Sequence, residues 1–347
     1  MHNLKLSLAS LFKVKVSDIN LQTVDGGLTH QSCICRVSGR RYFVKAYRLG
    51  GEFSYAVGKI NQLTSYMRNR GVPASRLVLY SPEYPNIVIH EFVEAAMATG
   101  NFSQIGGIAK LYSQVALIGA EHGRNLSKPE YLSAVNAFIE PIRNNEDMGL
   151  KVDASIYTGT LKLAEKALKF LQASLPEQGL FHIHMHDDFT EKNILMDVDQ
   201  VKLLCDWDSY RLKFLPEHLA CTVCRFSTDR PLEGALQTDK LFYFLRSLDP
   251  KVLGYIPNLE EFSQLFPLLA TLKHLRTYTF RNSLVVQGRL DLKRSLLAWP
   301  LEHCNWLMAN HQQVSDWVWE ALVGDQNEHI SSDLTQSLFS DLPRHND

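Results

Sequence analysis

The segment from Gly179 to Tyr210 contains the residues of this 347-residue chain whose types and spacing could do chemistry. His186, Asp188 and Asn193 lie on one loop between apolar runs, in the sequence FHIHMHDDFTEKNILM. Asp206 ends the second strand of the hairpin that the pattern predicts next. Two carboxylates and an amide are therefore expected to converge at one place.

Such a set suits phosphoryl transfer. This reaction needs a carboxylate that orients the attacking hydroxyl, and oxygen ligands for the Mg²⁺ that neutralises the phosphates. Asp188 would supply the first, and Asn193 and Asp206 the second. Asn193 lies five residues after Asp188, and Asp206 eighteen residues after it. This spacing matches the catalytic-loop Asp, catalytic-loop Asn and metal-binding Asp of kinases.

A structural role is the alternative, because acidic and amide side chains often cap backbone groups in turns. A His-x-Asp-x4-Asn pattern alone would favour that role. The surroundings favour the functional interpretation: an apolar strand precedes the loop, a hairpin follows it, and Asp206-Trp207-Asp208 stands at the end of the hairpin. A separate sheet with its own Gly-Gly loop and a lysine lies upstream.

The elements that must position these residues begin with that sheet. Residues 1–20 predict a short amphipathic helix. Three strand-like runs between residues 21 and 47 alternate with glycine-containing turns. Helical spacing covers 52–70 and ends at a Gly-Val-Pro stop, and two more strand-like runs occupy 76–80 and 86–93. A five-stranded antiparallel sheet with one inserted helix is predicted.

The remainder of the chain is predicted to be mainly helical, with the motif segment as a non-helical island. The candidate helices cover 105–122, 128–144, 156–174, 216–225, 232–248, 258–287, 292–308 and 313–323. The chain thus divides into an N-lobe over 1–93, a hinge over 94–104, a helical C-lobe over 105–324 and a polar tail over 325–347. This is an α+β organisation.

The motifs resemble those of the aminoglycoside phosphotransferase and choline kinase superfamily, the small-molecule relatives of protein kinases. The family's His-Gly-Asp-x4-Asn loop corresponds to His186-Asp187-Asp188-x4-Asn193, and its Ile-Asp-Trp/Phe-acid strand end to Cys205-Asp206-Trp207-Asp208. The resemblance covers about residues 26–225. The C-terminal helical region is similar to the family's variable acceptor-binding part, closest to the homoserine-kinase-like members.

The resemblance implies a bilobal protein-kinase-like fold and an ATP-dependent kinase of a small hydroxylated molecule, such as an amino alcohol, an aminoglycoside, homoserine or a sugar. It implies that Asp188 and Asn193 form the catalytic loop, with Asp188 as the base. Asn193 and Asp206 would hold Mg²⁺. Asp208 would either assist a second ion or simply end the hairpin in water.

The upstream sheet would then bind ATP. Its first loop could bring backbone N–H groups and hydroxyls to the phosphates through Gly27, Thr29 and Ser32. The same Asp-Gly-Gly sequence is also typical of a plain hairpin turn. Lys45 matches the third-strand lysine that contacts the α- and β-phosphates. Backbone groups of the inter-lobe segment that includes Glu91 and Val93 would hold the adenine.

One departure from the family concerns the inserted helix, which usually supplies a glutamate to the lysine. No acid occurs between Phe53 and Arg70, and the earlier Glu52 lies only seven residues after Lys45, which is short for a strand end, a turn and a helix face. Asn61 or Gln62 is therefore predicted to contact Lys45 instead. The missing acid prompts a non-catalytic nucleotide-binding pseudokinase as an alternative. A protein kinase is a further alternative, which the absence of Phe-Gly after Asp206 and of an Ala-Pro-Glu motif disfavours.

Composition and net charge limit the classes of partner that the chain is expected to bind. The chain has 36 basic and 37 acidic residues, net −1, which disfavours a general nucleic-acid or membrane-surface binder. Residues 1–150 hold 16 basic and 11 acidic residues, and the remainder 20 and 26. An acidic second part leans toward a cationic or amine-bearing acceptor. Few cysteines, no signal peptide and no apolar span of membrane length predict a cytoplasmic protein.

Overall fold

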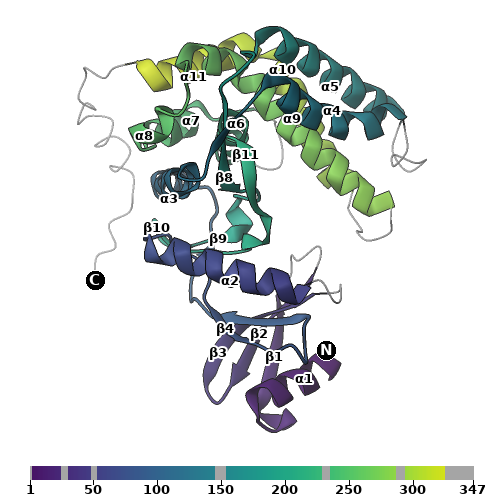
Figure 1. Cartoon of the computed structure of the whole chain (residues 1–347), viewed down its shortest axis with the longest axis vertical. Helices are drawn as coiled ribbons and strands as arrows, with labels where there is room; N and C mark the ends of the chain where they lie inside the picture. The colour runs from purple at the N-terminus through teal and green to yellow at the C-terminus, as the bar shows by residue number, and fades with distance from the viewer. Residues whose placement is uncertain are drawn as a thin grey trace, which may run out of the picture.

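A computed structural model describes residues 2–24, 30–47, 53–144, 154–228, 235–286 and 294–324. Figure 1 shows two lobes stacked along the long axis of the molecule, a small one built on a sheet and a large one that is mainly helical. This arrangement confirms the predicted α+β bilobal fold. The predicted phosphate-loop residues Gly27 and Thr29 lie outside the described residues, as does Glu52.

The small lobe contains the predicted five-stranded antiparallel sheet, in the order β1-β2-β3-β5-β4. Its strands are β1 (Ile19–Val24), β2 (His30–Val37), β3 (Arg40–Tyr47), β4 (Leu77–Tyr80) and β5 (Ile87–Glu91). The β2–β3 turn places Ser38 and Gly39 at φ 48° and 79°, the positive values that match the twist of a tight hairpin. Helix α2 (Phe53–Asn69) is inserted before β4, and Gly71 at φ 86° follows its end.

The two faces of this sheet carry different residues. Helix α1 (His2–Phe12) covers one face, where Leu8, Cys33 and Val44 share a buried core. Because side chains alternate along a strand, Lys45 lies on the other face, opposite Ser32 in β2. The sheet therefore separates an apolar core from the face that carries the predicted nucleotide lysine.

The large lobe holds the remaining helices, close to their predicted positions. They are α3 (Phe102–Ala120), α4 (Lys128–Asn144), α5 (Ala154–Ser174), α6 (Leu215–Phe226), α7 (Thr238–Arg246), α8 (Pro250–Leu253), α9 (Leu259–Val286), α10 (Arg294–Ala309) and α11 (His311–Val323). The helix predicted over 232–248 begins later, because Leu236 forms a β-bridge with Thr228. Within the described residues, no helix has the length and apolar character needed to cross a membrane.

Two small sheets position the motif segment at the junction of the lobes. One has the order β10-β9-β6 and the other β11-β8-β7. Their strands are β6 (Ala96–Met97), β7 (Arg124–Leu126), β8 (Leu180–His186), β9 (Ile194–Asp197), β10 (Gln200–Leu204) and β11 (Tyr210–Phe214). Helix α3 packs closely on β8, since a Cβ on Gly119 would lie 1.9 Å from the His184 carbonyl oxygen. The pattern analysis missed β6, β7 and β11, which are short or interrupted by polar residues.

Candidate active site

An ion pair joins the two lobes. Lys45 Nζ in β3 lies 2.5 Å from Asp206 Oδ1 at the end of the β9–β10 hairpin. Burial by itself lowers the pKa of Lys45, yet the Asp206 and Asp208 carboxylates raise it above its usual value. The Lys45 side chain is 7% exposed and remains charged because a carboxylate meets it.

The predicted contact of Lys45 with Asn61 or Gln62 is wrong. Among the described residues, Lys45 pairs with Asp206, while Asn61 lines a small neighbouring cavity with Tyr47 and His90. A carboxylate compensates a buried ammonium far better than an amide does. The residue that ends the metal-binding strand therefore takes the place of the helix acid in this structure.

The catalytic loop is held together by hydrogen bonds between the predicted residues. Asn193 Nδ2 donates to the backbone oxygen and to Oδ2 of Asp188, each at 2.8 Å. The Cys205 N–H donates to the Asn193 carbonyl oxygen at 2.9 Å, which brings the Asp206 strand end against the loop. Asp188, Asn193 and Asp206 are thus assembled at one place, as their spacing predicts.

His186 holds this loop in place through hydrogen bonds. It is fully buried, and its Nε2–H donates to the Cys205 carbonyl oxygen at 2.8 Å. Burial lowers the pKa of His186, so the ring is neutral. Its edge meets Trp207 at a centroid distance of 5.2 Å, and the backbone oxygen of His186 accepts a hydrogen bond from His218 Nε2 at 3.1 Å. His186 therefore acts through structure rather than as a proton donor to a ligand.

Asp206 adopts a backbone conformation that few residues other than glycine adopt, with φ 66° and ψ 47°. Such conformations cost about 1–3 kcal/mol and cluster at functional sites. Asp208, two residues later, accepts a 2.7 Å hydrogen bond from the Tyr47 hydroxyl of the small lobe. Of the two interpretations of Asp208, this contact favours a residue that belongs to the site.

The donor set fits a magnesium ion. Carboxylate and amide oxygens are the hard ligands that Mg²⁺ prefers. Because Asn193 Nδ2 is bonded to Asp188, the amide oxygen is the atom left to act as a ligand. Asp206 already attracts one cation, the Lys45 ammonium. Asn193 and Asp206 are the residues that would hold the ion, with Asp208 beside them.

Three other predicted nucleotide residues, Ser32, Glu91 and Val93, lie on or just after the strands that pair with β3. Ser32 is the cross-strand neighbour of Lys45. The Glu91 N–H donates to the Arg76 carbonyl oxygen at 2.9 Å, so Glu91 could meet an adenine only through its own carbonyl. The Val93 N–H makes no hydrogen bond to any residue that the structure describes, which leaves it able to bind a ligand.

Asp187 occupies the glycine position of the family motif, and the motif predicts no role for its carboxylate. Its carboxylate lies 2.8 Å from Lys213 Nζ in β11 and 3.3 Å from Arg211 Nε, and it also pairs with Lys273 of α9. Burial raises the pKa of Asp187, but the two lysines hold it well below its usual value. This cluster could not be found from sequence spacing, because Lys273 lies 86 residues away.

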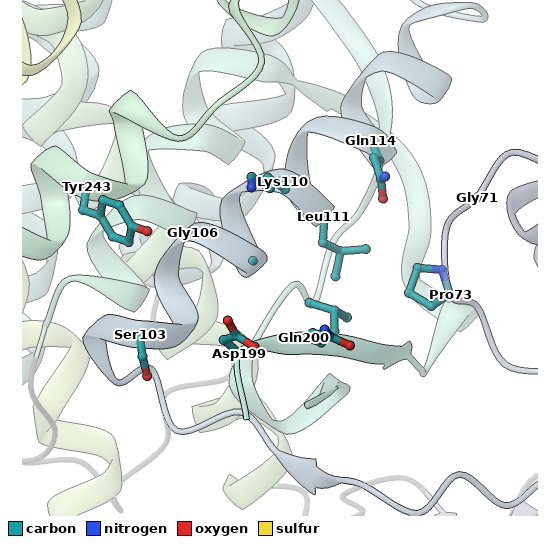
Figure 2. A pocket seen from close by; sticks show the side chains of 12 residues that line it. Gly71, Pro73, Ser103, Gly106, Lys110, Leu111, Gln114, Asp199, Gln200 and Tyr243 are labelled. Atoms are coloured by element: carbon teal, nitrogen blue, oxygen red, sulfur yellow. The ribbon is translucent and has the colours of Figure 1, made fainter. Parts of the chain in front are cut away.

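One cavity in the described part of the chain lies elsewhere. It has a volume of about 490 Å³ and opens between α3, β10 and the segment after α2 (Figure 2). Its lining includes Lys110, Gln200 and Pro73, and none of the predicted site residues. The predicted chemistry is therefore located at the junction of the lobes, not in this cavity.

A sequence model of the phosphotransferase enzyme family, APH, matches residues 20–250. The chain belongs to this family, which confirms the predicted superfamily and the prediction that the chain is a phosphotransferase. No curated protein matches its sequence.

Solved structures with the same fold share little sequence with the chain. Choline kinase from Cryptosporidium parvum has a TM-score of 0.60 at 12% identity, with 91% of this chain and 99% of the other covered. A choline/ethanolamine kinase family protein from Mesorhizobium loti has a TM-score of 0.61 at 13% identity, with 93% and 100% covered. A thermostable mutant of an aminoglycoside phosphotransferase, in a ternary complex with ADP and hygromycin B, has a TM-score of 0.55 at 12% identity, with 93% and 100% covered.

Proposed function

We propose that this phosphotransferase moves the γ-phosphoryl group of ATP to a hydroxyl group of a small molecule, with Asp188 as the general base. The observation that carries the proposal is the assembly of Lys45, Asp188, Asn193 and Asp206 at the junction of the lobes. All four residues that the reaction needs are present. This disfavours the non-catalytic pseudokinase alternative.

Each residue has a defined task in this proposal. Asp188 accepts the proton of the attacking hydroxyl, and Asn193 fixes the orientation of the Asp188 carboxylate through the 2.8 Å hydrogen bond. Lys45 places a positive charge against the phosphates. When bound, Mg²⁺ would neutralise the charge on the β- and γ-phosphates. The ADP in the similar aminoglycoside phosphotransferase supports the choice of nucleotide.

The cellular setting and the acceptor class are part of the proposal. All six cysteines are free thiols, which supports a reducing compartment such as the cytoplasm. Choline, ethanolamine and hygromycin B appear in the names of similar structures. These names support a small-molecule acceptor, and the amines of these molecules favour a cationic acceptor as one alternative.

The test is an ATP-consumption screen of amino alcohols, aminoglycosides, hydroxy acids and sugars, with protein substrates included for the protein-kinase alternative. We expect Mg²⁺-dependent transfer to at least one small alcohol. Asp188→Asn should lower its rate by roughly 10²–10⁴-fold while the Kd for Mg·ADP changes little. Asp199→Asn, an exposed carboxylate in the β9–β10 turn, is the matched control. A near wild-type rate for Asp188→Asn would refute the assignment.

A further inference from the structure

A surplus of positive charge borders the catalytic loop on the side away from Lys45. Its residues come from the loop itself, from β11, from the following helix α6 and from α9. Figure 1 shows β8 and β11 side by side in the large lobe, with α6 and α9 near them. Four cations and two carboxylates meet there: Arg211, Lys213, Lys273, Arg276, Asp187 and Glu217.

One of the two carboxylates is already satisfied. Glu217 accepts a 2.7 Å hydrogen bond from the Tyr131 hydroxyl and lies 3.1 Å from Arg276 Nη1. Glu217 is buried, and the charges of Glu217 and Arg276 offset each other. Asp187 is the carboxylate that remains for the other three cations.

Asp187 cannot balance those three cations alone. It pairs with Lys213, Lys273 and Arg211. Three of these four side chains are largely shielded from water, with exposed fractions of 16% for Asp187, 14% for Lys213 and 12% for Lys273. Arg211 is 60% exposed and reaches solvent. Among the described residues, two positive charges are left in excess, and one of the three cations is the solvent-exposed Arg211.

The excess has an energetic consequence. Burial, followed by repulsion from Lys273, lowers the pKa of Lys213 to about 8. A charge held away from water without a full counter-charge is costly. An anionic group placed among these side chains would supply the missing counter-charge and would favour the protonated state of Lys213.

The surplus also lies in the right place for an acceptor. Asp187 directly precedes Asp188, so their Cα atoms are about 3.8 Å apart across the peptide bond. The two side chains have different partners: Asp188 meets Asn193, while Asp187 meets the cations. A molecule anchored at the cations could therefore present a hydroxyl to the Asp188 carboxylate.

We propose that the acceptor carries an anionic group, a carboxylate or a phosphate, which binds to Lys213, Lys273 and Arg211. This inference rests on the proposed phosphotransferase function and specifies its substrate class. It opposes the cationic acceptor that the bulk charge of the second part of the chain suggests. Local charge outweighs that sum, because charges beyond roughly 10 Å are largely screened.

The experiment compares the binding of small alcohols that differ in charge. The set is 3-hydroxypropanoate, glycerol 3-phosphate, propane-1,3-diol and 3-aminopropan-1-ol, titrated calorimetrically into the full-length protein with Mg·ADP at constant ionic strength. We expect at least one anionic alcohol to bind about tenfold or more tightly than the diol and the amine. Whether the carboxylate or the phosphate binds more tightly identifies the anionic group.

Variants test whether the preference for an anionic alcohol depends on the two lysines. Lys273→Gln should remove the preference for the anion and leave the Kd for Mg·ADP unchanged, whereas Lys273→Arg should retain it. Lys213→Met provides an independent second variant, and Lys110→Gln on the exposed face of α3 is the control. Equal or tighter binding of the amine, no preference in the wild type, or a preference that survives both Lys273→Gln and Lys213→Met would overturn the inference.

The two proposals fail in different ways. Transfer to an amine-bearing alcohol that depends on Asp188 would uphold the phosphotransferase and refute the anionic acceptor. Binding of an anionic alcohol with no transfer from ATP to any alcohol in the screen would do the reverse.

Discussion

Two ionic centres flank the catalytic loop, and they are opposite in their excess charge. On the side of the small lobe, one ammonium, Lys45, faces the carboxylates Asp206 and Asp208. On the side of α9, one carboxylate, Asp187, faces two lysines and an arginine. The first centre has negative charge left over and suits a metal ion, while the second has positive charge left over and suits an anion. Asp188 lies between the two, where a hydroxyl would be activated.

The largest effect is expected from removing the cation of the first centre. Lys45→Met takes away the charge that is proposed to meet the phosphates and removes the ion pair with Asp206. We expect the rate of phosphoryl transfer to fall by roughly 10²–10³-fold and the KM for ATP to rise. Steady-state kinetics with varied ATP measures both. Lys110→Met is the control, and an unchanged rate in Lys45→Met would remove the small-lobe centre from the mechanism.

Both centres depend on β8, which leads into the catalytic loop. Gly119→Ala would place a Cβ 1.9 Å from the His184 carbonyl oxygen, so α3 and β8 must move apart. We expect a loss of about 2–3 kcal/mol in the free energy of unfolding, measured by urea denaturation. Gly159→Ala in α5, where a Cβ meets nothing within 4 Å, should instead gain about 0.5–1 kcal/mol. Equal stabilities of the two variants would show that the close approach is not required.

The second centre should be visible in the pH dependence of stability. The pKa of Lys213 is about 8 in the folded protein and 10.5 ordinarily. Between these values the unfolded chain binds more protons than the folded one, so this group makes the free energy of unfolding rise with pH. The rise should be about 1–2 kcal/mol between pH 8 and 10. Lys213→Met should lack it, and Lys110→Met should retain it. Parallel curves for wild type and Lys213→Met would show that the cluster imposes no strain on Lys213.

Much of the fold follows from local sequence patterns. Alternating apolar residues and glycine turns define the five-stranded sheet, and helical spacing predicts α9 over 258–287 against Leu259–Val286 in the structure. Strand β11 was missed because its sequence, YRLKF, follows the hairpin without a turn signal. Its pairing with β8 depends on tertiary contacts that periodicity does not reveal.

The candidate site also contains residues that the sequence predicts and residues that only the structure reveals. Asp188, Asn193 and Asp206 belong to one short segment with characteristic spacing, so the motif alone brought them together. The partner of Lys45 and the cations around Asp187 come from distant elements, and no spacing links them. The acidic excess after residue 150 is a sum over the whole second part of the chain, so it does not describe the local charges around Asp187.

The most direct test measures how one variant from each centre divides its effect between the two substrates. Lys45→Met should raise the KM for ATP and leave the KM for the acceptor nearly unchanged. Lys273→Gln should raise the KM for the acceptor and leave the KM for ATP nearly unchanged. Both variants should be compared with wild type in a single two-substrate kinetic experiment. Two variants that raise the same KM would contradict the division of the site by its catalytic loop.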